Sequence, residues 1–214
     1  MSKLFAHSLL LPAMLLCSGA FKADATTITF DDVSVHNNPA VTVTNGYAGL
    51  NWNNFAVLDG TTLPGSGFST GTVSGTHVAF NNNGTLATLA SSTGAFSFNS
   101  GYFTSAWVDG LQVTVQGFLG GVIQDSTTFI INTHVPTLET FAWTNVDSVA
   151  ISASDPSNLD ITATEFVLDN LTINAPKNVA SPAPEPSSCA VLGLSILAIG
   201  RLSRRKSSKL LTGI

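Results

Sequence analysis

The chain has 214 residues, with eight Lys and Arg, thirteen Asp and Glu, and a formal net charge of −5. All eight basic residues lie outside residues 26–176, whereas that body holds nine Asp and two Glu, a formal charge of about −11. A body without Lys or Arg repels phosphate-rich polymers, so its composition excludes nucleic-acid binding. The body also lacks Cys, so no disulfide holds it, and divalent cations are the expected neutralisers of its carboxylates.

Residues 1–25 have the layout of a secretory signal peptide. Lys3 supplies a positive start, Leu9–Cys17 an apolar segment, and Ala23-Asp24-Ala25 a small-x-small cleavage site. We therefore expect export through the Sec translocon and cleavage by signal peptidase after Ala25. Lipid attachment at Cys17 is the alternative, but Leu16 stands where such signals usually carry a small residue.

The body, residues 26–175, is predicted to be an all-β, antiparallel β-sandwich. Short segments alternate apolar and polar residues, and turn-forming residues separate them, as at 65–75, 81–84, Gly120-Gly121 and Asp155-Pro156. The alternating apolar pairs and triplets are Ile28/Phe30, Val41/Val43, Val78/Phe80, Phe96/Phe98, Leu111/Val113/Val115, Phe129/Ile131, Val149/Ile151 and Phe166/Leu168. The sequence predicts no helix before the tail.

The tail has three parts in a fixed order. A Pro-rich linker, 176–186, ends in Pro184-Glu185-Pro186, and an apolar run of about 14 residues follows it. A basic cluster comes next, and residues 207–214 end the chain. We expect 187–206 to form one transmembrane helix and its basic stop, with 207–214 in the cytoplasm. The stop residues are Arg201, Arg204, Arg205 and Lys206.

This order of parts resembles the PEP-CTERM sorting signal of Gram-negative bacteria that make exopolysaccharide. The resemblance implies that exosortase, a membrane protease-transpeptidase, processes the tail near Pro184-Glu185-Pro186. It also implies transient anchoring in the inner membrane, followed by residence at the outer surface or in the extracellular matrix. Three body segments look like domains often attached to such tails, which implies a jelly-roll-like sandwich: Gly46–Phe55, Phe141–Val149 and Phe166–Leu171.

Calcium is the candidate cofactor of the body. Asp31 and Asp32 end the first predicted strand, while Asp169 and Asn170 interrupt the last one. Because the first and last strands of jelly rolls commonly lie side by side, these oxygens are expected to meet, with a bulge at Asp169-Asn170. The alternative is that these side chains only accept hydrogen bonds from the amides of turns.

Tyr47, Tyr102 and Trp107 are the candidate glycan contacts, because they sit near strand ends and an aromatic face can stack on a sugar ring. Trp52 and Trp143 share the parity of core residues, so both are expected to point inward. Glu139 is expected on a solvated strand face.

A catalytic site is not predicted. Gly67-Phe68-Ser69-Thr70-Gly71 fits the G-x-S-x-G pattern of hydrolases, but that motif needs a strand before Ser69 and a helix after it. The resulting hypothesis is a non-enzymatic surface or matrix protein associated with exopolysaccharide and biofilm. A calcium-assisted carbohydrate-binding module is the first alternative and a secreted glycan hydrolase the second.

Overall fold

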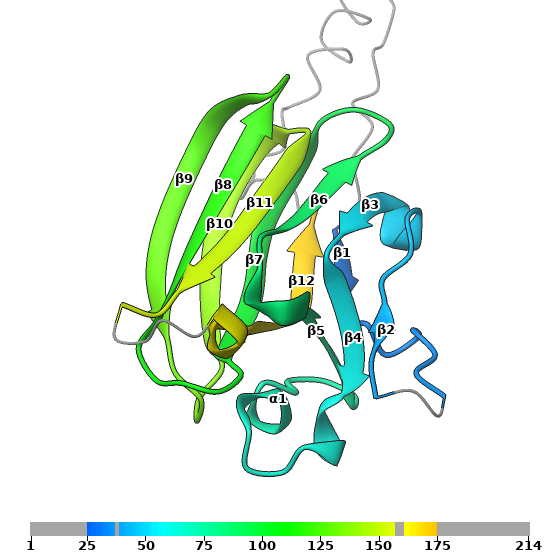
Figure 1. The fold of residues 1–214 in the computed structure, drawn as a ribbon. Helices are drawn as coiled ribbons and strands as arrows, with labels where there is room; N and C mark the ends of the chain where they lie inside the picture. The colour runs from blue at the N-terminus through cyan, green and yellow to red at the C-terminus, as the bar shows by residue number, and fades with distance from the viewer. Residues whose placement is uncertain (1–24, 37–38, 157–160, 175–214) are drawn as a thin grey trace, which may run out of the picture. The chain divides into compact units, whose positions relative to one another are not determined.

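The structure is a computed structural model that describes residues 25–36, 39–156 and 161–174. Strands make up most of the described chain (Figure 1). Their bounds are β1 Thr26–Ile28, β2 Val41–Thr42, β3 Leu50–Asn53, β4 Phe55–Asp59, β5 His77–Asn81, β6 Ala87–Ser91, β7 Phe96–Ser105, β8 Leu111–Leu119, β9 Val122–Ile131, β10 Thr137–Val146, β11 Ser148–Ser154 and β12 Phe166–Ile173. The helical turns are η1 Tyr47–Gly49, η2 Gly60–Thr62, α1 Gly67–Thr70, η3 Asn82–Gly84 and η4 Ile161–Thr164.

The strands form two antiparallel sheets. Sheet A has seven strands in the order β10-β7-β12-β5-β4-β2, with β1 also paired to β12. Sheet B has five strands in the order β3-β6-β11-β8-β9. The predicted all-β antiparallel sandwich is therefore confirmed. The predicted leader, linker and transmembrane helix lie outside the described residues, and among those described no helix is long and apolar enough to cross a membrane.

The main core fills the space between the two sheets with the inward side chains of the alternating segments. Phe98, Phe103 and Phe166 from sheet A and Val113 and Ile151 from sheet B are all fully buried. Trp52 is 5% exposed, with its ring edge-on to its neighbour Phe55 at 5.1 Å, as its parity predicts. Trp143 is half-buried and packs against Phe98 and Phe141. Apolar alternation thus identifies most of this core correctly.

A second, smaller core lies on the outer face of sheet A. It contains Phe68 of α1, which packs edge-on against Phe80 of β5 at a centroid distance of 5.2 Å. The helical turn α1 covers this face, within a stretch that the sequence predicts as a turn without a helix. That prediction is wrong for Gly67–Thr70, where the Gly67 N–H donates to the Ala106 carbonyl at 3.0 Å and fixes the turn against the end of β7.

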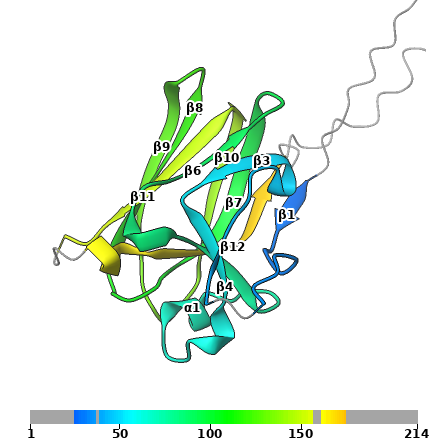
Figure 2. The ribbon, with the colours of Figure 1, turned by 45° about the vertical axis from the view of Figure 1, so that its right-hand side comes forward.

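The first and last strands lie side by side, as predicted. Thr26 pairs with Ile173 and Ile28 with Leu171, and Figure 2 shows β1 next to β12. The register of β12 against β7 shifts after Asp169, which confirms the predicted bulge. The predicted strand over Ile28 and Phe30 is too long, because β1 ends at Ile28 and Phe30 enters a turn with φ of 62°.

Glu139 does not lie on the solvated face that the sequence predicts. In the pairing of β10 with β7, Glu139 lies opposite Gly101. The pair two residues away, Thr137 and Phe103, lies on the same face of the sheet, and Phe103 is fully buried in the core. Directly opposed residues share a face of the sheet, so Glu139 points toward the core side. The absence of a side chain on Gly101 leaves room for this half-buried carboxyl, whose pKa burial raises.

Replacing Glu139 by Gln is expected to stabilise the protein slightly at neutral pH. A carboxyl whose pKa is raised in the folded state destabilises that state above this pKa, and the penalty disappears once the group is protonated in both states. The gain should stay below about 1 kcal/mol, since water still screens this half-exposed group. Urea unfolding at about pH 7 and at about pH 4 measures it, and an equal gain at both pH values would contradict the explanation.

Candidate functional site

The buried Asp169 fastens the loop after α1 to the bulge of β12. Its side chain is 0% exposed, and Oδ2 accepts hydrogen bonds from the N–H groups of Val73 at 2.8 Å and Ser74 at 2.9 Å. Oδ1 accepts from the N–H of Asn170 at 2.7 Å, and the Asn170 side-chain oxygen accepts from the Ser74 hydroxyl at 2.7 Å. Burial raises the pKa of Asp169 and outweighs these hydrogen bonds, which act in the opposite direction.

Asp31 holds the next part of the same loop. Its Oδ1 accepts from the N–H groups of Thr76 at 2.8 Å and His77 at 3.1 Å. Burial works to raise the pKa of Asp31, but the amide hydrogen bonds from His77 and Thr76 lower it below the ordinary value. The charge of Asp31 also disfavours ionisation of Asp169, so the two carboxyls are electrostatically coupled.

The structure brings only part of the predicted calcium set together. Asp31, Asp169 and Asn170 meet at the loop, whereas Asp32 accepts a hydrogen bond from the Tyr47 hydroxyl at 2.6 Å. The Oδ2 atom of Asp169 and the Oδ1 atom of Asp31 accept hydrogen bonds from backbone amides. The alternative to calcium binding, in which these side chains hold the amides of turns, predicts such bonds. Within residues 25–36, 39–156 and 161–174, no three His, Cys, Asp or Glu gather in a way that could hold a metal ion. Calcium binding stays a prediction.

Tyr47 borders a small hollow beside β1. The hollow has a volume of about 260 Å³. It is lined by Thr26, Thr27, Ile28, Thr29, Asp32, Tyr47 and Ala48. The ring of Tyr47 packs against Phe30 and Trp52 at centroid distances of 6.0 and 6.1 Å, so the ring helps to close the core. Burial, followed by the hydrogen bond to Asp32, raises the pKa of its hydroxyl.

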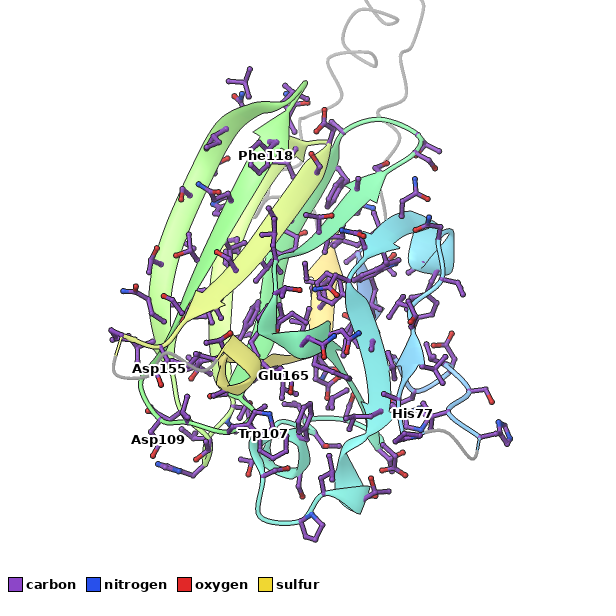
Figure 3. All side chains as sticks on the ribbon, viewed as in Figure 1. His77, Trp107, Asp109, Phe118, Asp155 and Glu165 are labelled. Carbon is purple, nitrogen blue, oxygen red and sulfur yellow. The ribbon has the colours of Figure 1, made fainter. Side chains whose placement is uncertain are left out.

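Trp107 is the candidate glycan contact that the structure exposes most clearly. Its side chain is 50% exposed, while Tyr47 and Tyr102 are half-buried. The indole N–H donates to Glu165 Oε2 at 2.8 Å, and Phe68 packs edge-on against the ring at 5.4 Å. Figure 3 shows Trp107 and Glu165 at the same end of the sandwich, beside α1. Two fixed contacts thus hold an exposed aromatic ring in one orientation.

Glu165 is a site residue that the sequence reasoning missed. Its Oε1 accepts from the N–H of Asn83 at 3.1 Å, so the carboxyl bridges the η3 turn and the indole of Trp107. Burial raises its pKa, and the hydrogen bonds from Trp107 and Asn83 oppose that shift. Glu165 lies 58 positions from Trp107 in the sequence, so no local pattern could pair them.

The G-x-S-x-G segment does not form a hydrolase site in the described structure. Ser69 lies inside α1 instead of on a strand-to-helix turn, and no hydrogen bond joins it to a histidine among the described residues. His134 instead lies 3.4 Å from Asp109, whose carboxylate accepts from the N–H and hydroxyl of Thr133. These Thr133 hydrogen bonds lower the pKa of Asp109.

The predicted sorting residues fall almost entirely outside the described chain. Ala25 is its first residue and is exposed. The Pro184-Glu185-Pro186 motif and the basic cluster of Arg201, Arg204, Arg205 and Lys206 lie beyond Asn174, where the described part ends.

Comparison with known proteins gives a distant likeness among solved structures. No family model matches the chain, and no curated protein matches it. Among solved structures, the chain is similar to TmCBM61, described in complex with β-1,4-galactotriose. The sequence identity is 11%, the match covers 60% of this chain and 92% of that one, and the TM-score is 0.38. A likeness this low says nothing of what the chain binds.

Proposed function

We propose that this chain is an exported surface or matrix protein that exosortase processes and that associates with exopolysaccharide in biofilm. The observation that carries the proposal is the order of the tail, in which Pro184-Glu185-Pro186, an apolar run and a basic cluster follow one another. The apolar run stops translocation, and the basic residues after it stay cytoplasmic. The body, which we take to be jelly-roll-like, is thereby held outside the membrane.

The charge distribution also supports a tail that contacts the membrane and a body that does not. Lys177 and the five tail residues carry six of the eight positive charges, while the body of 26–176 carries none and is strongly acidic. Such a body is repelled by anionic lipid headgroups, whereas the tail is attracted to them. The body is therefore suited to leave the membrane once the tail is removed.

Replacing Pro184-Glu185-Pro186 by three alanines is expected to block release. In cells that contain exosortase, the variant should remain in the membrane fraction with its tail, while the unchanged protein loses the tail and reaches the surface. Cell fractionation with an antibody against the body, and intact mass of each fraction, measure this. A control replaces Pro182, which precedes the motif, by alanine. Equal release of the triple-alanine variant and the unchanged protein would contradict the proposal.

A second candidate function is glycan binding at Trp107, and the exposed, fixed indole ring is the observation that favours it. Aromatic rings stack on the apolar faces of sugars, and a ring held in advance loses little entropy when it binds. The neighbouring carboxyl of Glu165 offers an acceptor for sugar hydroxyls. This site needs no metal, so it is separable from the predicted calcium site.

Replacing Trp107 by Ala is expected to weaken co-sedimentation with the exopolysaccharide of the same cells by about tenfold, because one stacked ring contributes roughly 1–2 kcal/mol. Leu138→Ala is the matched control, since Leu138 is also 50% exposed but lies on β10. Equal binding by both variants and the unchanged protein would rule out this use of Trp107. A loss that EDTA alone reproduces would point to calcium instead.

A further inference from the structure

The sandwich has a long and regular edge strand, β9, which ends sheet B and pairs with β8 alone among the described strands. The other edges are short or broken. The strand β2 has two residues and β3 has four. The long edge β10 is interrupted by two register shifts, with Ala142 and Asn145 at positive φ. In β9, by contrast, Asp125–Ile131 pairs with β8 in unbroken register, and Figure 1 shows β9 at the outer side of sheet B.

The strand β9 has few of the devices that usually prevent edge strands from pairing with another chain. Such devices are lysines, prolines, inward charges or a bulge in mid-strand. The sequence of β9 contains neither Lys nor Pro, and the bulge lies at its beginning, opposite Gly117 and Phe118. Its one charged residue, Asp125, lies on the inner face at the first position of the regular segment. Its outer face carries Ile130, which is 61% exposed. The open backbone groups of Asp125–Ile131 are therefore available to a further strand.

The surface beside β9 is also uncharged. The register places these neighbours on the same outer face of sheet B: Ser126, Thr128 and Ile130 of β9, Gln112, Thr114 and Gln116 of β8, and Ala150, Ser152 and Ser154 of β11. None of them ionises. The body as a whole carries a charge of about −11, so two copies repel one another over most of their surfaces. At the uncharged outer face around β9, two copies can approach one another without this electrostatic repulsion.

We propose that two copies of this protein associate through β9, pairing antiparallel about a two-fold axis that continues sheet B from one copy into the other. Centring the axis on Thr128 uses the whole regular segment. Thr128 then faces its own counterpart, Ser126 faces Ile130 of the second copy, and Asp125 faces Ile131. Opposed residues share a face in each of these pairs, so both sandwiches lie on the same side of the joined sheet.

This register keeps the remaining charges apart. The two Asp125 carboxylates come to lie at opposite ends of the joined segment, six residues apart along the strand. At about 3.4 Å per residue the separation is roughly 20 Å, which is more than twice the screening length of about 8 Å at physiological salt. The proposal goes beyond the sorting function, since it rests on β9 alone and holds whether or not the tail is processed.

A cysteine at the axis gives the sharpest test. In the full chain with Cys17→Ser and Cys189→Ser, Thr128→Cys is expected to form a disulfide-linked dimer under mild oxidation, because directly opposed antiparallel residues have Cα atoms about 4.5–5.5 Å apart. Asn51→Cys is the control. It is exposed on the same face of sheet B but on β3, at the far edge. No more dimer from Thr128→Cys than from Asn51→Cys would overturn the proposal.

Lysines on β9 test the same pairing without a crosslink. The double variant Ser126→Lys with Ile130→Lys is expected to weaken self-association at least tenfold in sedimentation velocity of the full chain, in a detergent that keeps the tail dissolved. Asn51→Lys should associate as the unchanged protein does, because the tail is the same in all three. A double variant that melts at the unchanged temperature and still associates fully would also overturn the proposal.

Discussion

Replacing Gly67 by alanine is expected to destabilise the protein by about 3 kcal/mol or more. A Cβ at this position would lie 1.6 Å from the carbonyl oxygen of Ser105 and 2.6 Å from its carbonyl carbon. Both are backbone atoms at the end of β7, so no side-chain rotation relieves the overlap. The helical turn α1 must move away, and Phe68, which is buried in the second core, loses its contacts with Phe80.

Thermal unfolding followed by circular dichroism measures this effect. A loss of this size corresponds to a fall in Tm of roughly 6–12 °C for a domain of this length. Ser69→Ala, two positions along the same turn, is the matched control, since it adds no atom and the Ser69 hydroxyl makes no hydrogen bond in the described structure. Equal melting temperatures for the Gly67 variant and the unchanged protein would show that α1 does not pack on β7 as described.

Replacing Asp169 by Asn is expected to destabilise the protein by about 2–3 kcal/mol. The side chain of Asp169 meets three N–H donors, two at Oδ2 and one at Oδ1. An amide has a single acceptor oxygen, so its NH₂ group must face at least one of these donors. The partly buried N–H groups of Val73 and Ser74, or that of Asn170, are then left without an acceptor.

Urea unfolding of Asp169→Asn at neutral pH measures this cost, and Asp32→Asn provides the control. Asp32 is exposed and accepts one hydrogen bond, from Tyr47, so its change should cost less than about 1 kcal/mol. A calcium site formed by Asp31 and Asp169 predicts a different pattern, in which added calcium stabilises the unchanged protein and not the variant. Similar unfolding of both variants would contradict the role of Asp169 as the anchor of its loop.

The alternating segments of the sequence predicted the sandwich, because side-chain direction in a strand follows a two-residue period. Strict alternation failed where the backbone departs from that period. Phe30 is buried through a turn of positive φ, and Glu139 faces the core side because Gly101 opposite it leaves space. Both exceptions depend on a neighbouring strand or turn that the local pattern does not contain.

The candidate site was predicted only in part for the same reason. The predicted pairing of the first and last strands correctly placed Asp31 near Asp169. The N–H groups that donate to these carboxylates, however, belong to Val73, Ser74 and Thr76, in a loop whose sequence has no alternation or motif that predicts the contact. The hydrogen bond from Trp107 to Glu165 likewise joins segments far apart in the sequence. Such contacts follow from tertiary register, which one sequence does not specify.

The measurement that tests the sorting account most directly is the mass, with both terminal sequences, of the protein recovered from the surface and matrix of its own cells. The account predicts a chain that begins at Thr26 and ends close to Pro184-Glu185-Pro186, without the basic cluster. A surface protein that still carries Arg201–Lys206 would contradict processing by exosortase. A chain that begins before Ala25 would contradict cleavage of the leader at that residue.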